Sequence, residues 1–121
     1  MKCVMIDCSR NAVMNVKSVK KFAETIKSLG FDSLMLYTED TFEVDNEPYF
    51  GYMRGRYSKN EIKELDAFCK YIGIELIPCI QTLAHLNAIF KWWDEYMPIN
   101  DCDDILLCGE ERTYTLIDNI F

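Results

Sequence analysis

Apolar and polar positions follow two different periods along the chain. Nearly continuous apolar runs over residues 3–7, 33–37 and 74–80 have the length and apolar content of buried strands. Segments 16–29 and 59–72 instead carry apolar residues three and four positions apart, the pattern of a helix with one buried face. Strand, helix, strand, helix, strand is the order of βαβ units, so we expect an α/β fold with a parallel sheet covered on both faces.

Local signals mark the ends of both predicted helices. Asn15 has the side chain of an N-cap, and Gly30 follows the helix where a left-handed residue is needed. Ser58 and Glu61 have the spacing of a capping box, and Gly73 ends that helix. Each helix is therefore bounded by a strand on either side.

Beyond the third strand, the pattern predicts further short elements. Residues 83–93 have helical spacing, which Pro98 stops. Residues 104–108 resemble a short strand, and Thr113 is a candidate cap for a last helix over 113–121. We expect a sheet of three or four parallel strands.

The length fits one domain over residues 1–121, about half of the roughly 250 residues of a closed eight-stranded α/β barrel. A small parallel sheet leaves bare strand edges, and the last apolar stretch has no cap. We therefore expect a fragment of a larger barrel, or a chain completed by a partner. A homo-oligomer is one arrangement that would cover the edges.

Charge and hydropathy narrow the partners. The net charge of −7 argues against nucleic acid and anionic membranes, because affinity for both comes from clustered Lys and Arg. No apolar window has membrane-spanning length, and the first strand begins too early for a signal peptide, so we expect a cytoplasmic protein. The six cysteines lack paired CxxC spacing, which favours free, mostly buried thiols and no metal site.

Candidate chemistry gathers where the strands end. In parallel α/β folds these ends share one face. The first strand leads to Asp7 and Arg10, the second to Glu39 and Asp40, and the third to His85, the only histidine. His near neutral pH can hold or pass a proton, a neighbouring carboxylate fixes its tautomer, and Arg anchors hydroxyls or anions. The set suits a polar small molecule.

Each of these residues also has a structural explanation. Arg10 could pair with Asp7 at the surface, and Glu39 and Asp40 could form a solvated acidic turn or cap a helix. A lone histidine such as His85 is more often a core or helix-surface residue than a catalyst. The three loops together favour the functional interpretation, because the βα order brings them to one face.

The long loop over residues 43–57 is rich in aromatic and arginine side chains, including Tyr52 and Arg54. Sugar rings are held by aromatic faces beside hydrogen-bonding groups, so we expect Tyr52 and Arg54, with Asp7 and Arg10, to contact substrate. The alternative is a surface loop that packs on itself.

Four segments, in this order, are similar to one enzyme family: DCSRN (7–11), LYTEDTFEV (36–44), EPYFGYMRGRY (47–57) and IELIPCIQTLAHL (74–86). They resemble the first part of the catalytic barrel of family 20 glycoside hydrolases, the β-N-acetylhexosaminidases, and especially the bacterial single-barrel relatives. The resemblance covers nearly the whole chain. It implies a partial (βα)8 TIM barrel of about the first three βα units, and retaining hydrolysis of terminal N-acetylglucosamine or N-acetylgalactosamine without metal or cofactor.

The resemblance also implies residue roles. In this family the acetamido oxygen of the substrate attacks the anomeric carbon, while a Glu protonates the leaving oxygen and an Asp orients the acetamido group. Arg10 is similar to the arginine that grips the outer hydroxyls of the sugar. Glu39 and Asp40 occupy the second-strand acidic position, and His85 resembles the histidine that, with an acidic group, tunes the proton-donating Glu.

The sequence departs from the family in one respect. The Asp-Glu pair follows an HxGxDE-type motif at the fourth strand, and these 121 residues contain no such motif. Glu110 and Glu111 do not replace it, since they precede the last predicted helix. We therefore expect no hexosaminidase activity from this chain alone, and a non-catalytic sugar-binding or regulatory half-barrel is the alternative.

Overall fold

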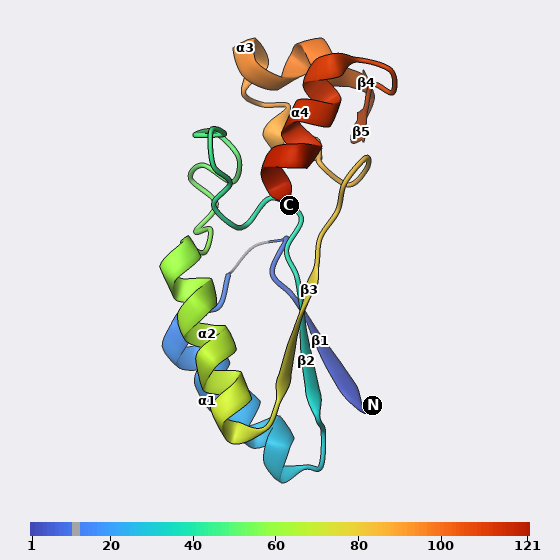
Figure 1. Cartoon of the computed structure of the whole chain (residues 1–121). Helices are drawn as coiled ribbons and strands as arrows, with labels where there is room; N and C mark the ends of the chain where they lie inside the picture. Colours follow the sequence, from blue (N-terminus) through green and yellow to red (C-terminus); the bar gives the residue numbers. More distant parts are fainter. Residues whose placement is uncertain (11–12) are drawn as a thin grey trace.

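The structure, a computed structural model, describes residues 1–10 and 13–121, so Asn11 of the DCSRN motif lies outside it. Strands β1 (Cys3–Asp7), β2 (Ser33–Tyr37) and β3 (Glu75–Cys79) form one sheet in the order β1-β2-β3 (Figure 1). Both pairings are parallel. The predicted strands and their direction are confirmed.

Helices α1 (Val16–Ser28) and α2 (Lys59–Ile72) connect the strands. The Asn15 side chain accepts a hydrogen bond from the Ser18 N–H at 2.9 Å, as predicted for an N-cap. The capping box of Ser58 and Glu61 is complete, and Gly73 ends α2 with a φ of 73°. These caps satisfy backbone groups that the helix ends would otherwise leave unpaired.

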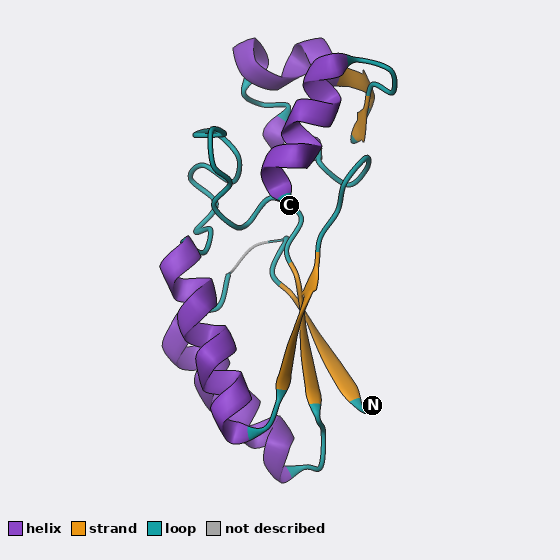
Figure 2. Ribbon diagram, viewed as in Figure 1, coloured by secondary structure: helices purple, strands orange, loops and turns teal. Residues whose placement is uncertain are grey.

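Both helices lie on the same face of the sheet (Figure 2). The expectation of a sheet covered on both faces is therefore wrong. The strands follow one another in sequence order, and crossovers of one hand then place successive helices on one side. Val19, Leu34 and Leu65 are fully buried between the layers, whereas Met5 on the opposite face is exposed. A sheet in chain order with helices on one face is consistent with part of a TIM barrel wall.

The C-terminal segment, defined here as residues 83–121, lies beyond the carboxyl ends of the strands (Figure 1). Its apolar side chains pack in a second cluster with Val44 and Phe50 of the loop between β2 and α2. None of the described helices is both long and apolar enough to cross a membrane. The elements of the C-terminal segment are η1 (Asn87–Ile89), α3 (Trp93–Tyr96), η2 (Met97–Ile99), β4 (Asn100–Cys102), β5 (Ile105–Leu106) and α4 (Glu111–Ile120).

The prediction of a helix over residues 83–93 is wrong. His85 has a φ of 62°, a left-handed conformation that a right-handed helix does not accommodate. The backbone also finds other partners, because the Leu86 N–H donates to the Asp104 carbonyl and the Leu83 carbonyl accepts from the Leu106 N–H. Only the short elements η1 and α3 form there.

Two further details of this segment differ from expectation. The predicted strand over 104–108 is reduced to β5, which pairs antiparallel with β4 and does not join the parallel sheet. Thr113 does not cap the last helix, because α4 begins after Glu110. Thr113 is buried inside the helix, and its hydroxyl donates to the Leu107 carbonyl at 2.9 Å.

The cysteines are all free thiols, as predicted. They are not mostly buried: Cys8 and Cys69 are buried, whereas Cys102 and Cys108 are exposed. The exposed pair lies in the C-terminal segment, where the structure confirms the last predicted helix as α4 but differs from the rest of the predicted pattern.

Among the residues that the structure describes, β1 and β3 each pair with β2 alone. The Glu75 N–H and the Cys79 carbonyl bond toward β2, so the alternate residues of β3 face the free edge. Pro78 is one of them. This position suits proline, which has no N–H to donate to a neighbouring strand.

Replacing Leu34 by Ala tests the core between sheet and helices. Leu34 is fully buried in the central strand, so the cavity should lower the free energy of unfolding by about 3 kcal/mol. Urea denaturation followed by circular dichroism measures this. The control is Leu29→Ala at an exposed helix end, which should change stability by less than about 0.5 kcal/mol. Equal effects would contradict the described packing.

Candidate functional site

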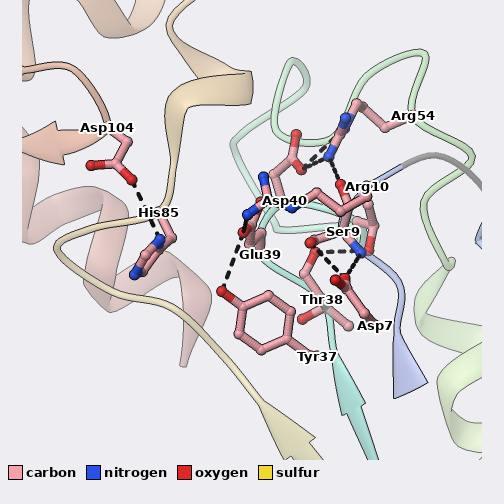
Figure 3. Close-up of polar contacts among 11 residues, drawn as sticks. Asp7, Ser9, Arg10, Tyr37, Thr38, Glu39, Asp40, Arg54, His85 and Asp104 are labelled. Carbon is pink, nitrogen blue, oxygen red and sulfur yellow. Dashed lines mark hydrogen bonds and ion pairs between the residues drawn. The ribbon is translucent and has the colours of Figure 1, made fainter. Parts of the chain in front are cut away.

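Polar side chains from several loops line one pocket beyond the strand ends (Figure 3). Arg10 follows β1, Glu39 follows β2, and His85 follows β3. Arg54 comes from the β2–α2 loop, and Asp104 from the turn between β4 and β5. With Ser9, Asn87 and Ala88, these residues enclose about 150 Å³. The structure thus brings together the guanidinium, carboxylate and imidazole that the sequence placed at one face.

Glu39 is a buried acid beside an exposed arginine. It is 4% exposed and accepts a hydrogen bond from the Tyr37 hydroxyl at 3.2 Å. Arg10 Nη2 lies 3.6 Å from Glu39 Oε1, which is a charge attraction rather than a hydrogen bond. Because the Arg10 side chain is 71% exposed, its fork of donors faces solvent. The alternative that Arg10 pairs with Asp7 at the surface is wrong, because its ion-pair partner is Glu39.

Asp40 holds Arg54 in place. Asp40 is 1% exposed, and Arg54 Nε and Nη2 lie 3.2 and 3.1 Å from its Oδ1. Arg54 also donates to the Ser9 carbonyl, so it joins the β2–α2 loop to the loop after β1. The alternative of a solvated acidic turn is wrong, because Glu39 and Asp40 are both buried. Asp40 contacts Arg54 and does not line the pocket itself.

Asp7 shapes the loop that carries Arg10. Its Oδ1 accepts from the Ser9 hydroxyl at 2.6 Å and from the Ser9 N–H at 2.8 Å. These hydrogen bonds, the side-chain bond first, lower the pKa of Asp7 below 3.8; burial acts against them, and the charge of Arg10 adds a smaller attraction. Asp7 therefore remains ionised and positions the turn, and it is not among the residues that line the pocket.

His85 has an acidic partner that sequence analysis missed. His85 Nδ1 lies 3.4 Å from Asp104 Oδ2, and the imidazole is about half exposed. A carboxylate this close to one ring nitrogen attracts a proton to that nitrogen. The sequence pattern places Asp104 in a predicted strand over 104–108. No local signal marks Asp104 as a site residue, because the antiparallel pairing of β4 and β5 brings it to His85 from 19 positions further along the chain.

Other residues of the long loop have structural roles. The Tyr52 ring packs 5.9 Å from Tyr49 and 5.2 Å from Trp92 between ring centres, and it does not line the pocket. Arg56 donates to two carbonyls of its own loop. The Tyr57 hydroxyl is buried and donates to a carbonyl near the start of α1. For these residues the alternative of a surface loop that packs on itself is therefore the better description. Arg54 is the residue of this loop that lines the pocket.

Glu47 is a third buried acid, and the sequence pattern did not reveal it. It is 3% exposed and accepts two hydrogen bonds from Arg112, at 2.8 and 2.7 Å. The Tyr96 hydroxyl donates at 3.0 Å and the Asn119 amide at 2.9 Å. The hydrogen bonds to Glu47 raise the pKa of Arg112, and burial is the main cause that raises the pKa of Tyr96. Each of these partners belongs to the C-terminal segment.

The pocket contains charges of both signs. Arg10 and Arg54 offer N–H donors, and Glu39 and Asp104 offer acceptors. Across residues 1–10 and 13–121, no three His, Cys, Asp or Glu side chains converge as a metal site would require. The arrangement can bind a compact ligand with several hydroxyl or amide groups.

Comparisons with solved structures identify the fold. No protein-family model and no curated protein match the sequence. A mutant Streptomyces plicatus β-hexosaminidase in complex with GlcNAc matches 98% of this chain, with a TM-score of 0.81 and 22% identity. The family 20 β-N-acetylhexosaminidase of Streptomyces coelicolor matches 98% with a TM-score of 0.78 and 21% identity. Flavobacterium johnsoniae chitobiase matches 99% with a TM-score of 0.81 and 19% identity.

The shared part is a minority of each solved chain. The matches cover 28%, 29% and 21% of those three proteins. At these identities the likeness establishes the fold: the chain has the α/β architecture found in part of family 20 β-hexosaminidases.

Ser9→Ala tests the turn that carries Arg10. Loss of the hydroxyl removes the largest cause of the low pKa of Asp7, so this pKa should rise toward 3.8. A depressed carboxyl pKa stabilises the fold above pH 3.8 and loses that contribution as pH falls through the folded-state value. The variant should therefore lose less stability on acidification. Carboxyl NMR titration measures the pKa, with Ser28→Ala on α1 as control; an unchanged Asp7 titration would refute the assignment.

Proposed function

We propose that this chain forms the first part of the catalytic barrel of a family 20 glycoside hydrolase, about three βα units long. The enzyme would be a retaining β-N-acetylhexosaminidase acting on terminal N-acetylglucosamine or N-acetylgalactosamine. The observation that carries the proposal is the common pocket of Arg10, Glu39 and His85 at the carboxyl ends of parallel strands. The fold shared with β-hexosaminidases supports it.

The sugar-binding wall consists of the two arginines and Glu39. Arg10 presents an exposed, planar fork that matches a pair of neighbouring hydroxyls on a pyranose ring. Glu39 lies beside it as a buried acceptor, and Arg54 is already oriented by Asp40. Because Glu39 and Arg54 are held in place before the ligand arrives, little of their conformational entropy is lost on binding.

The catalytic role of His85 is indirect. In substrate-assisted retaining hydrolysis the acetamido oxygen displaces the leaving group, which a carboxylic acid protonates. His85, oriented by Asp104, supports that acid through its other ring nitrogen. In the family that the chain resembles, the acid and the Asp that orients the acetamido group belong to an HxGxDE-type motif, and these 121 residues contain no such motif. This chemistry uses no metal and no cofactor.

A non-catalytic sugar-binding or regulatory half-barrel is the second candidate. It is favoured by the observation that Arg10, Glu39 and Arg54 form their contacts without the missing motif. In either case self-association would cover the free strand edges, and the six free thiols favour a reducing, cytoplasmic setting.

The 121-residue chain should not hydrolyse a nitrophenyl N-acetylglucosaminide. It lacks the acid that protonates the leaving oxygen, so nitrophenol release should equal that of the buffer blank. Adding a barrel polypeptide that carries the Asp-Glu pair should restore turnover if the chain is part of a hydrolase. Turnover by the chain alone that disappears in His85→Ala would contradict the proposed division of roles.

Arg10→Ala should weaken binding of N-acetylglucosamine about tenfold, because it removes a charge-assisted hydrogen bond to the sugar. Isothermal calorimetry or saturation-transfer NMR measures the dissociation constant. Lys21→Ala, an exposed cation on α1 away from the pocket, is the matched control and should bind like the parent. If both variants bind equally, Arg10 is not a sugar ligand; if the parent binds no amino sugar, the half-barrel candidate fails.

A further inference from the structure

The pocket has two walls that belong to different parts of the chain. Arg10, Glu39 and Arg54 form one wall, supported by the parallel sheet and the β2–α2 loop. His85 and Asp104 form the other wall, and both lie in the C-terminal segment. The width of the pocket therefore depends on how this segment is attached to the rest of the molecule.

Two kinds of contact attach the segment. The first is the apolar cluster in which Val44 and Phe50 pack against side chains of residues 86–120. The second is polar and centres on one carboxylate. Within the part of the chain that the structure describes, every side-chain hydrogen bond between residues 1–82 and 83–121 ends on Glu47.

The two kinds of contact constrain the segment differently. Apolar burial is non-directional, so it holds the segment down without fixing its rotation. The Arg112 fork binds Glu47 through two parallel hydrogen bonds, which require one relative orientation. Tyr96 and Asn119 fill the remaining acceptor positions, and the Arg112 guanidinium also lies 5.7 Å from the Tyr96 ring centre. A segment that rotates would break all of these at once.

We propose that Glu47 and Arg112 are positioning residues of the pocket, which hold the His85–Asp104 wall at a fixed distance from the Arg10–Glu39 wall. Neither residue lines the pocket. They act through the C-terminal segment, whose elements α3 and α4 supply Tyr96, Arg112 and Asn119. Only the consequence for sugar binding rests on the proposed function.

Trp92 provides a reporter that does not depend on sugar binding. It lies in the C-terminal segment and packs 5.3 and 5.2 Å from Tyr49 and Tyr52 of the β2–α2 loop, so it spans the contact that Glu47 maintains. The other tryptophan, Trp93, is exposed. A Trp93→Phe background therefore leaves Trp92 as the single fluorophore.

Glu47→Gln in this background should shift the Trp92 emission to longer wavelength, because water replaces the two tyrosine rings around the indole. The His85 imidazole signals, the only ones in the spectrum, should also move, although His85 does not touch Glu47. Asp45→Asn is the matched control in the same loop, since it removes an equivalent charge from an exposed ion pair with Lys59. It should leave both readouts unchanged.

Arg112→Lys keeps the charge but loses the fork, and it is the second variant if Glu47→Gln fails to fold by circular dichroism. It should give the same shifts with smaller amplitude. Parent-like Trp92 emission and His85 signals in a folded Glu47→Gln or Arg112→Lys protein would overturn the proposal.

Measuring sugar affinity separates the positioning role of Glu47 from the proposed sugar-binding function. Where the parent binds N-acetylglucosamine, Glu47→Gln should weaken binding about tenfold, the equivalent of one hydrogen bond to a charged group, and Asp45→Asn should not. Unchanged affinity in the folded variant would contradict the role of Glu47 in the pocket. Where the parent binds no N-acetylglucosamine, the sugar-binding half-barrel candidate fails, and the Trp92 and His85 readouts still decide whether Glu47 positions the two walls.

Discussion

The parallel pairing of β1, β2 and β3 in chain order is the constraint on which the rest of the structure depends. It sets Asp7, Tyr37 and Cys79 side by side in the sheet, so the three following loops begin at the same height. Hydrogen bonds of the ladder cannot slip by one residue without moving the buried side chains to the opposite face. A pocket made from residues far apart in sequence therefore follows from the register.

The sequence predicted the part of the molecule in which local signals and final structure agree. Caps such as Asn15 and Ser58 act within three residues of themselves, and the apolar periods required no distant partner. The conformation of the C-terminal segment depends instead on contacts between distant residues. Its backbone at Leu86 bonds to residue 104, and Arg112 meets an acid 65 positions earlier. Contacts between such distant residues produce no periodic pattern in the sequence. The apolar spacing around His85 therefore predicted a helix where the structure has turns.

Sequence analysis placed three of the pocket residues together for a simple reason and misjudged the β2–α2 loop for another. Arg10, Glu39 and His85 follow strands, and strand order alone places them. The β2–α2 loop is shaped by close packing instead: Gly51 has a φ of 66°, and a Cβ there would lie 2.0 Å from the Asp40 carbonyl. Its aromatic and arginine side chains mostly secure this compact path, so composition overstated how many of them face a ligand.

The proline in the outer strand β3 limits how copies of this chain could associate. Joining the open side of β3 to the open side of β1 in another molecule would repeat without closing, which is the geometry of a fibre. Each such junction would place Pro78 where an amide proton should bridge the molecules, and the β1 partner would keep an unpaired carbonyl. As an outer-strand residue of this sheet, Pro78 thus disfavours this one head-to-tail pairing between copies of the chain.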